Sequence, residues 1–314
     1  ILAARPSQLT EQSLVAGASG ITVSEAANYE VKVSVAEGLT VISSAPLTKV
    51  EEAINSTESE KRKTYQFSGS NLRGFGLAIA ERIKSVEQQV GATKVASYFR
   101  EGDDRLGKRA LDVCVRAVET YSQSFGAYPY PLLQTIEMPL SAGHSSTELT
   151  SLIALAQAYY IDFDSPKSSR LPGFLREQAD VIKTSFEFSL AHGVARQWWG
   201  VAVGSDSERT PYLDEALASY SAAYYHEAAY GKGLGDIILK QQLYGTYQAY
   251  RMLGGADMEV DKPARDFRNA LQFTAIVQAK GAILFSLLRQ ELGDKKFFNA
   301  LKNYYSANRF RLAT

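Results

Sequence analysis

The sequence reads AHGVARQWWG from residue 191 to 200 and YLDEALASY from residue 212 to 220. His192 and Arg196 are four residues apart, so a helix would place both on one face. Eighteen residues separate Arg196 from Glu215. Apolar residues recur at helical spacing through and around both stretches, and this pattern predicts helices over residues 173–199 and 213–230.

The two stretches resemble the active-site helix pair of the gluzincin aminopeptidases, the aminopeptidase N family of zinc metallopeptidases. That family has H-E-x-x-H, then eighteen residues, then E, commonly within A-H-E-x-A-H-Q-W-W/F-G. Three more segments resemble the family: residues 121–131 its F-G-x-Y-P-Y region, residues 138–143 the approach to its G-x-M-E-N loop, and residues 277–288 its Y-x-K-G-A segment. The resemblance implies an α+β fold, in which the end of an N-terminal β domain precedes a largely helical, thermolysin-like catalytic domain.

The metal-binding positions can be carried over one by one. In the family, the two histidines and the later glutamate hold zinc, and the motif glutamate is the base that deprotonates the metal-bound water. His192 stands at the first ligand position and Glu215 at the third. Gly193 stands at the base position and Arg196 at the second ligand position. The resemblance therefore implies a vestigial zinc site that has lost one ligand and its base.

The substrate-binding positions differ from the family as well. The G-x-M-E-N loop, whose glutamate holds the substrate amino terminus, falls on residues 143–147, so His144 and Ser145 are vestigial positions. Glu148 could take the lost role in a shifted loop. Gln278 stands where the family has the tyrosine that stabilises the oxyanion, two residues before Lys280.

These changes predict a pseudopeptidase without zinc. Arginine is always protonated and carries only hydrogen-bond donors, so Arg196 cannot ligate a metal ion. A fixed cation about 4 Å from Zn²⁺ repels it by several kcal/mol even at an effective dielectric constant of about 20. We expect Arg196 to pair with Glu215 instead, and the inherited groove to bind a peptide or protein or to serve a structural role.

Other interpretations stay open at this point. The chain could be a working zinc aminopeptidase with an atypical ligand set, for example His192, Glu215 and His144. Without the resemblance, His192 would be an ordinary core histidine of an amphipathic helix. His226 begins a second H-E-x-x pattern, but its last position is Tyr230, so we interpret this segment as helix packing.

Composition excludes several classes of function. The 314 residues contain 34 Lys and Arg against 34 Asp and Glu, so the formal net charge is zero. This balance gives no electrostatic reason to expect nucleic acid or an anionic membrane as a partner. Hydrophobic residues make up 45% of the chain, as in ordinary globular proteins. No stretch approaches the roughly 18 to 20 uninterrupted apolar residues of a membrane span, so we expect no span in this segment, and no signal indicates a cellular location.

Hydrophobic patterning changes near residue 103. Before it, apolar Tyr29, Val31, Val33 and Val35 alternate with polar residues, which predicts a strand. After it, apolar residues recur at helical spacing through residues 106–125, with Cys114 on the apolar face as a core residue. We expect a partial β-rich domain over residues 1–102 and a metallopeptidase-like domain over residues 103–314. The missing initial Met and the abrupt C-terminal end lead us to expect a piece of a longer protein.

Overall fold

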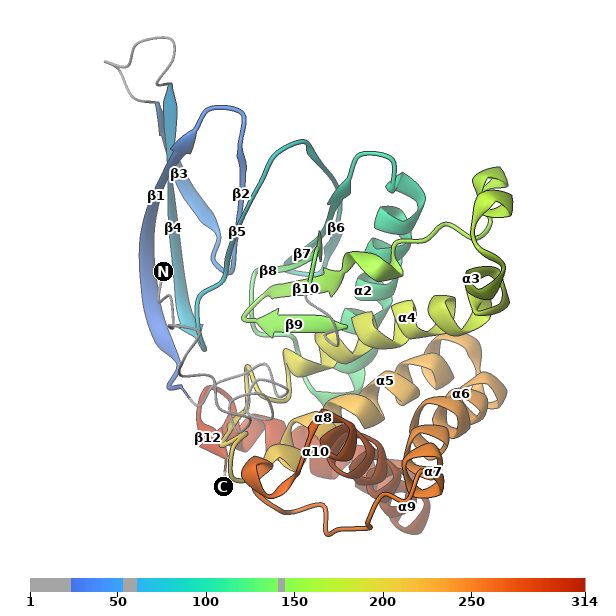
Figure 1. Ribbon diagram of the computed structural model, residues 1–314. Helices are drawn as coiled ribbons and strands as arrows, with labels where there is room; N and C mark the ends of the chain where they lie inside the picture. Colours follow the sequence, from blue (N-terminus) through green and yellow to red (C-terminus); the bar gives the residue numbers. More distant parts are fainter. Residues whose placement is uncertain (1–23, 53–60, 141–144, 314) are drawn as a thin grey trace. The chain divides into compact units, whose positions relative to one another are not determined.

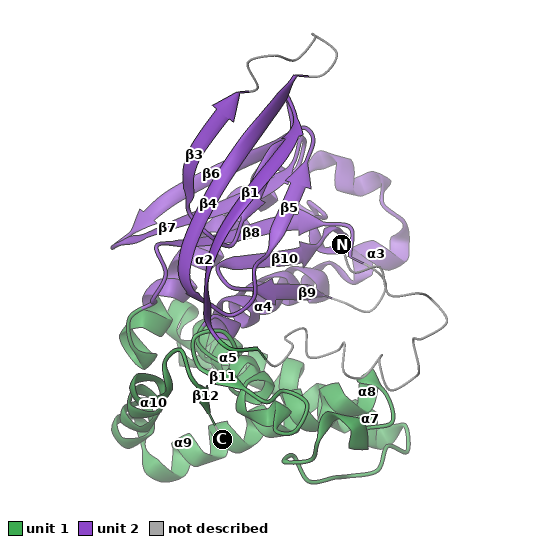
Figure 2. Cartoon of the chain, turned by 90° about the vertical axis from the view of Figure 1, so that its left-hand side faces the viewer, with its two compact units in different colours: residues 1–25, 120–127, 198–314 green, residues 26–119, 128–197 purple. Residues whose placement is uncertain are grey.

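The computed structural model describes residues 24–52, 61–140 and 145–313. The chain forms two compact units, which are described separately (Figure 2). The sheet unit comprises residues 26–119 and 128–197, and the helical unit comprises residues 1–25, 120–127 and 198–314. Strands followed by helices confirm the α+β class, whereas the domain boundary at residues 102 and 103 stays a prediction.

Two small antiparallel sheets open the sheet unit. The first has the order β1 (Ala27–Ala36), β4 (Arg62–Leu72), β3 (Leu47–Glu52), and the second pairs β2 (Thr40–Ser43) with β5 (Leu77–Ala80). Val31 lies opposite Phe67 and Val33 opposite Tyr65, so the alternating residues of β1 share one face with the apolar residues of β4. The predicted strand at residues 29–35 is confirmed.

A five-stranded sheet forms the centre of this unit. Its order is β6 (Ile83–Val90), β7 (Thr93–Arg100), β8 (Leu132–Met138), β10 (Leu152–Ala156), β9 (Ser146–Leu149). The inner strands β7, β8 and β10 are parallel, and the edge strands β6 and β9 are antiparallel to their neighbours. Val95, Leu133 and Ile153 on the three parallel strands are fully buried, as expected for a parallel sheet covered by other elements.

Helices pack on this central sheet (Figure 1). They are α2 (Asp104–Phe125), which continues into the helical unit, and α4 (Ala179–Arg196). The short helix α3 (Gly173–Glu177), which has no buried residue, precedes α4, and short 3₁₀ turns lie at Gln157–Tyr159 and Pro166–Arg170. A Cβ on Gly107 would lie within 2.3 Å of three ring atoms of Phe99, so a glycine is needed where α2 crosses β7. Cys114 is buried as predicted, and burial raises the pKa of its thiol to about 12.

The helical unit is built around consecutive helices. They are α5 (Glu215–Tyr230), α6 (Lys232–Ile238), α7 (Gly245–Met252), α8 (Ala270–Phe273), α9 (Gly281–Leu292) and α10 (Asp294–Asn308). A π-helical segment, Leu239–Tyr244, joins α6 to α7, and a second one, η9 (Thr274–Lys280), joins α8 to α9. Short 3₁₀ turns cover Pro211–Leu213 and Ala264–Asp266, and β11 (Gly204–Ser205) pairs in parallel with β12 (Leu312–Ala313).

Within the described residues, the continuous helix Ala270–Leu292 is long and apolar enough to cross a membrane by length and composition. However, 56% of its most apolar window is buried inside the structure. Its inner residues, among them Phe273, Ile276 and Val277, form a hydrophobic cluster of the helical unit. This burial is what a core helix requires.

Candidate functional site

The first half of the candidate site lies at the C-terminal end of α4 in the sheet unit. His192 is half-buried, Gly193 is buried, and Arg196 is the last residue of the helix with 0% of its surface exposed. The cationic side chain complements the negative end of the helix dipole at this position. The helix therefore presents His192 and Arg196 on one face, as the spacing predicts.

Gly193, which the family resemblance assigns to the base position, has little room for a side chain. A Cβ added to Gly193 would lie 2.9 Å from Cγ2 of Ile153 and 3.2 Å from Oε1 of Glu148. Ile153 is fully buried on the inner strand β10 and is branched at Cβ, so it can move little. The space beside Gly193 is thus already filled by a methyl group and a carboxylate.

Glu148 supplies that carboxylate from strand β9. Its partner across the strand pair is Ile153, and only 5% of its surface is exposed. Ser146, two residues earlier on the same face of the strand, donates a hydrogen bond from Oγ to Oε1 of Glu148 over 2.5 Å. Ser145 lies exposed just before β9, and His144 lies outside the described residues.

Gln197 fixes the turn between β9 and β10 against the end of α4. Its Oε1 accepts a hydrogen bond from the backbone N–H of Ser151 over 2.8 Å, and its Nε2 donates to the carbonyl oxygen of Leu149 over 3.0 Å. The sequence did not single out this residue, although it stands inside the quoted AHGVARQWWG stretch. Gln197 is therefore a positioning residue for the strand that carries Glu148.

The second half of the candidate site lies at the start of α5 in the helical unit. Asp214 caps the helix, since its Oδ1 accepts a hydrogen bond from the backbone N–H of Glu215 over 2.7 Å. Ser207 donates a hydrogen bond to the other oxygen of Asp214. Glu215 is the first residue of the helix and is 2% exposed, and a helix N-terminus favours a carboxylate there.

Gln278 contacts Glu215 directly. Its Nε2 donates a hydrogen bond to Oε2 of Glu215 over 2.8 Å, from the π-helical segment η9 to the start of α5. π-helical segments often mark functional positions. The structure thus brings together two of the residues that the sequence assigns to the vestigial site.

The residues after Gln278 hold this arrangement in place. Lys280 donates hydrogen bonds to Oδ1 of Asp257 and to the carbonyl oxygen of Met258, each over 2.7 Å. A Cβ on Gly281 would lie 2.6 Å from Cβ of Ala216, so the glycine permits α9 to approach α5 closely. The Lys280-Gly281 pair therefore has a structural explanation in the helical unit.

His226 does not form a second site. It is buried in α5, where its Nδ1 lies 2.8 Å from the carbonyl oxygen of Ala222 and its ring packs against Tyr225 and Tyr230. Glu227 instead forms an ion pair with Arg289. The interpretation of this segment as helix packing is confirmed.

Within residues 24–52, 61–140 and 145–313, no three side chains of His, Cys, Asp or Glu are placed so that they could hold a metal ion. His144 is outside these ranges, so an atypical ligand set that includes it stays a prediction.

Known proteins similar to this chain are aminopeptidases. Aminopeptidase N of Lactococcus lactis subsp. lactis is 28% identical over 215 residues, which cover 64% of this chain and 22% of that protein. Aminopeptidase M1-D of Oryza sativa subsp. japonica is 24% identical over 284 residues, covering 88% of this chain and 30% of the relative. Probable aminopeptidase 2 of Sulfurisphaera tokodaii is 22% identical over 312 residues, covering 92% and 35%.

The chain thus spans between about a fifth and a third of the length of these relatives. The model of the peptidase family M1 domain matches residues 109–314, which is more than half of the chain. The match includes the candidate residues on α4 and those on α5 and η9. The chain belongs to peptidase family M1.

Proposed function

We propose that this chain is a non-catalytic member of the family, with a thermolysin-like arrangement of the residues after α2, that binds the amino terminus of a peptide or protein. The observation that carries this proposal is the packing of Glu148 and Ile153 against Gly193. It supports the loss of the motif base, because residue 193 carries no side chain and the space beside it is filled by Ile153 and Glu148. It also supports binding, because it leaves a buried carboxylate beside α4.

The donor set of the motif does not fit zinc. His192 and Glu215 are possible ligands, but Arg196 has only protonated donors and remains charged at any ordinary pH. Glu215 already accepts a hydrogen bond from Gln278. A zinc ion with two protein ligands and a nearby fixed cation would lack the three-residue ligand set that catalytic zinc sites use. We therefore derive no hydrolytic step for this chain.

Glu148 is the group that we assign to ligand binding. A buried carboxylate is costly unless it is hydrogen-bonded or paired with a cation. Among the described residues, Glu148 accepts its side-chain hydrogen bond from the neutral hydroxyl of Ser146. An ammonium group would satisfy the carboxylate with a charge-assisted hydrogen bond. Glu148 thus takes the role that the family resemblance gives to the loop glutamate, in the shifted register that the sequence leaves open.

Peptide binding tests this proposal directly. We expect a peptide with a free amino terminus to bind the purified chain, and its acetylated form to bind at least about tenfold more weakly, since a charged hydrogen bond contributes about 1.5–3 kcal/mol. Glu148→Gln should remove this difference, whereas Glu177→Gln, an exposed acid in α3, should retain it. Equal binding of both peptides to the wild-type chain would contradict the proposal.

A working zinc aminopeptidase is the second candidate, favoured by the names of the relatives. It requires a third ligand in place of Arg196 and a base in place of Gly193. Hydrolysis of an aminoacyl substrate that depends on added zinc and is abolished by His192→Ala would establish it. In that case the non-catalytic assignment fails, while the assignment of Glu148 to the amino terminus can still hold.

A further inference from the structure

The sheet unit contains a pocket between the N-terminal halves of α2 and α4 that no described residue of the candidate site lines. Its volume is about 440 Å³, which falls in the range of small-molecule sites. Apolar and aromatic side chains line much of it: Leu106, Tyr159, Ile161, Ile182 and Phe186. The vestigial motif residues of α4 do not line it, because the pocket contacts α4 only between Ile182 and Glu187.

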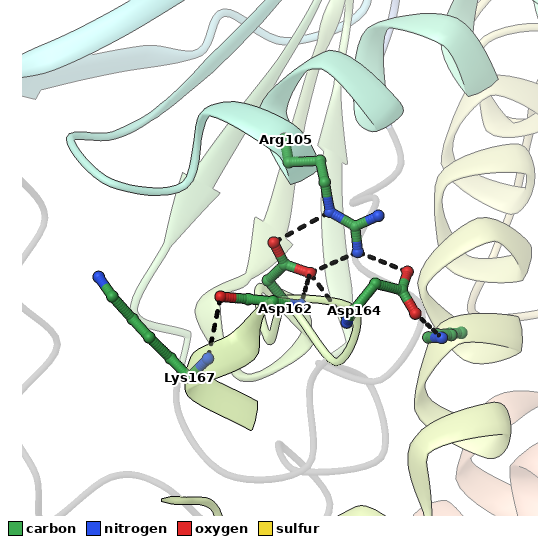
Figure 3. Close-up of polar contacts among 6 residues, drawn as sticks. Arg105, Asp162, Asp164 and Lys167 are labelled. Atoms are coloured by element: carbon green, nitrogen blue, oxygen red, sulfur yellow. Dashed lines mark hydrogen bonds and ion pairs between the residues drawn. The ribbon is translucent and has the colours of Figure 1, made fainter. Parts of the chain in front are cut away.

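Three lining residues, Arg105, Asp164 and Lys183, belong to a group of ion pairs that also includes Asp162 (Figure 3). Arg105 on α2 donates hydrogen bonds to both carboxylate oxygens of Asp162 and to Asp164, and Lys183 on α4 donates to Asp164 over 2.6 Å. Backbone N–H groups of Asp164 and Ser165 also donate to Asp162. The pKa of Asp162 is held below its usual value chiefly by Arg105, and that of Asp164 chiefly by Lys183.

A second ion pair joins the two helices further along. Arg109 on α2 pairs with Glu187 on α4, and both residues line the pocket. The pair of Arg109 with Glu187, and the pairs of Arg105 and Lys183 with Asp164, link α2 to α4. They leave little charge free to recruit a ligand.

Two charged residues of the lining remain without such partners. Lys108 is exposed and Asp112 is half-buried, both on α2, and neither has a hydrogen-bond or ion-pair partner among the residues that the structure describes. They are four residues apart, so they lie on the same face of the helix with about 5–6 Å between their Cβ atoms. The pocket therefore offers one cation and one anion beside an apolar floor.

We propose that this pocket binds a free α-amino acid with a large apolar side chain. The carboxylate of the ligand pairs with Lys108, its ammonium group pairs with Asp112, and its side chain packs on Ile182 and Phe186. A ligand with only one of the two charges would leave the other protein charge unpaired. A side chain without apolar surface would leave the floor of the pocket in water. The proposal is independent of the vestigial site, because none of its residues takes part.

Calorimetric titration of the purified chain tests this site with a set of analogues. We expect L-leucine or L-phenylalanine to bind with a dissociation constant below about 1 mM. N-acetyl-L-leucine lacks the ammonium group, L-leucinamide lacks the carboxylate and glycine lacks the apolar side chain, and each should bind at least about tenfold more weakly. These comparisons need no variant and therefore do not depend on the folding of one.

Variants then assign the contacts. Asp112→Asn should weaken L-leucine binding about tenfold and leave the weak binding of N-acetyl-L-leucine unchanged. Lys108→Gln should also weaken L-leucine binding about tenfold, but it should leave the weak binding of L-leucinamide unchanged. Glu119→Gln, an exposed acid of α2 outside the pocket, is the matched control and should bind like wild type. Three outcomes would each overturn the proposal: no binding of either amino acid at about 10 mM, equal binding of all analogues, or unchanged L-leucine affinity in both pocket variants.

Discussion

The side-chain amide of Gln278 donates a hydrogen bond to the carboxylate of Glu215, with 2.8 Å between Nε2 and Oε2. These residues are 63 positions apart in the sequence, and the family resemblance assigns both to the vestigial site. The amide satisfies a carboxylate that is 2% exposed. This contact explains how the helical unit stabilises a buried acid through its own side chains.

Replacing Gln278 by Leu should therefore destabilise the chain. The variant removes a hydrogen bond to a charged, buried group, and we expect the free energy of unfolding to fall by about 1–3 kcal/mol in urea denaturation. Gln248→Leu, at an exposed position of α7, is the control and should change the value by less than about 0.5 kcal/mol. Equal effects of the two variants would show that the hydrogen bond contributes nothing.

Gly193→Ala should also be destabilising, against the usual trend for helices. Alanine favours a helix interior by about 1 kcal/mol over glycine. Here the new Cβ would meet Cγ2 of Ile153 at 2.9 Å, and overpacking typically costs about 1–3 kcal/mol. Gly233→Ala in α6, where a Cβ meets nothing within 4 Å, should instead be neutral or stabilising.

Thermal unfolding of the two alanine variants, and of Gly193→Ala in an Ile153→Ala background, separates these effects. The cost of Gly193→Ala should shrink when Ile153 is truncated, because the clash is then relieved. A stabilised Gly193→Ala variant would mean that the base position does have room for a side chain.

Glu137 should make stability fall as the pH rises through the weakly acidic range. It is 4% exposed, and burial is the main reason that its pKa is raised, although Oε2 accepts a hydrogen bond from the backbone N–H of Arg100. Asp103 adds a smaller repulsive contribution. Between the ordinary pKa and the raised pKa, the folded chain binds more protons than the unfolded chain, so stability decreases across this interval.

Glu137→Gln removes this titration and keeps an acceptor for Arg100. We expect the variant to gain stability relative to wild type at about pH 7, where the carboxylate is charged, and to lose this gain at about pH 3.5, below the ordinary Glu value. Chemical denaturation at both pH values measures the effect. Glu101→Gln, at an exposed position, is the control and should differ from wild type in stability by the same small amount at both pH values. A stability gain for Glu137→Gln that is independent of pH would contradict the assignment.

The pairing of Arg196 with Glu215 stays a prediction from the motif spacing, and a double-mutant cycle tests it. Arg196 is 0% exposed and Glu215 is 2% exposed, so leaving either charge without compensation is costly. We expect Arg196→Ala to cost about 3–5 kcal/mol and the double variant with Glu215→Gln to cost clearly less than the two single variants together. A cost within about 0.5 kcal/mol for Arg196→Ala would exclude the pair.

The sequence predicted elements that have a clear hydrophobic period. The alternation in β1 and the apolar stripe of α2 both gave elements that the structure confirms. Strand β3 gave no such signal, because all six of its residues, Leu47–Glu52, are exposed and no face of it is buried. Strand β9 has only four residues, too few for a period to be read.

The candidate site was predictable only where it follows from spacing along one helix. His192, Gly193 and Arg196 could be placed on α4 from the motif alone. The contact of Glu148 with Gly193 depends on the register of β9 against β10. Pairing between the strands sets this register, and the spacing of residues in the loop does not predict it. The contact of Gln278 with Glu215 depends on the packing of η9 against α5.

The most direct test of the non-catalytic assignment is the metal content of the purified chain, measured by elemental mass spectrometry after dialysis against zinc. An aminoacyl fluorogenic substrate is assayed on the same sample. We predict substoichiometric zinc and no turnover, because the family resemblance assigns Arg196 to a ligand position and Gly193 to the base position. One zinc ion per chain together with hydrolysis of the substrate would contradict the account.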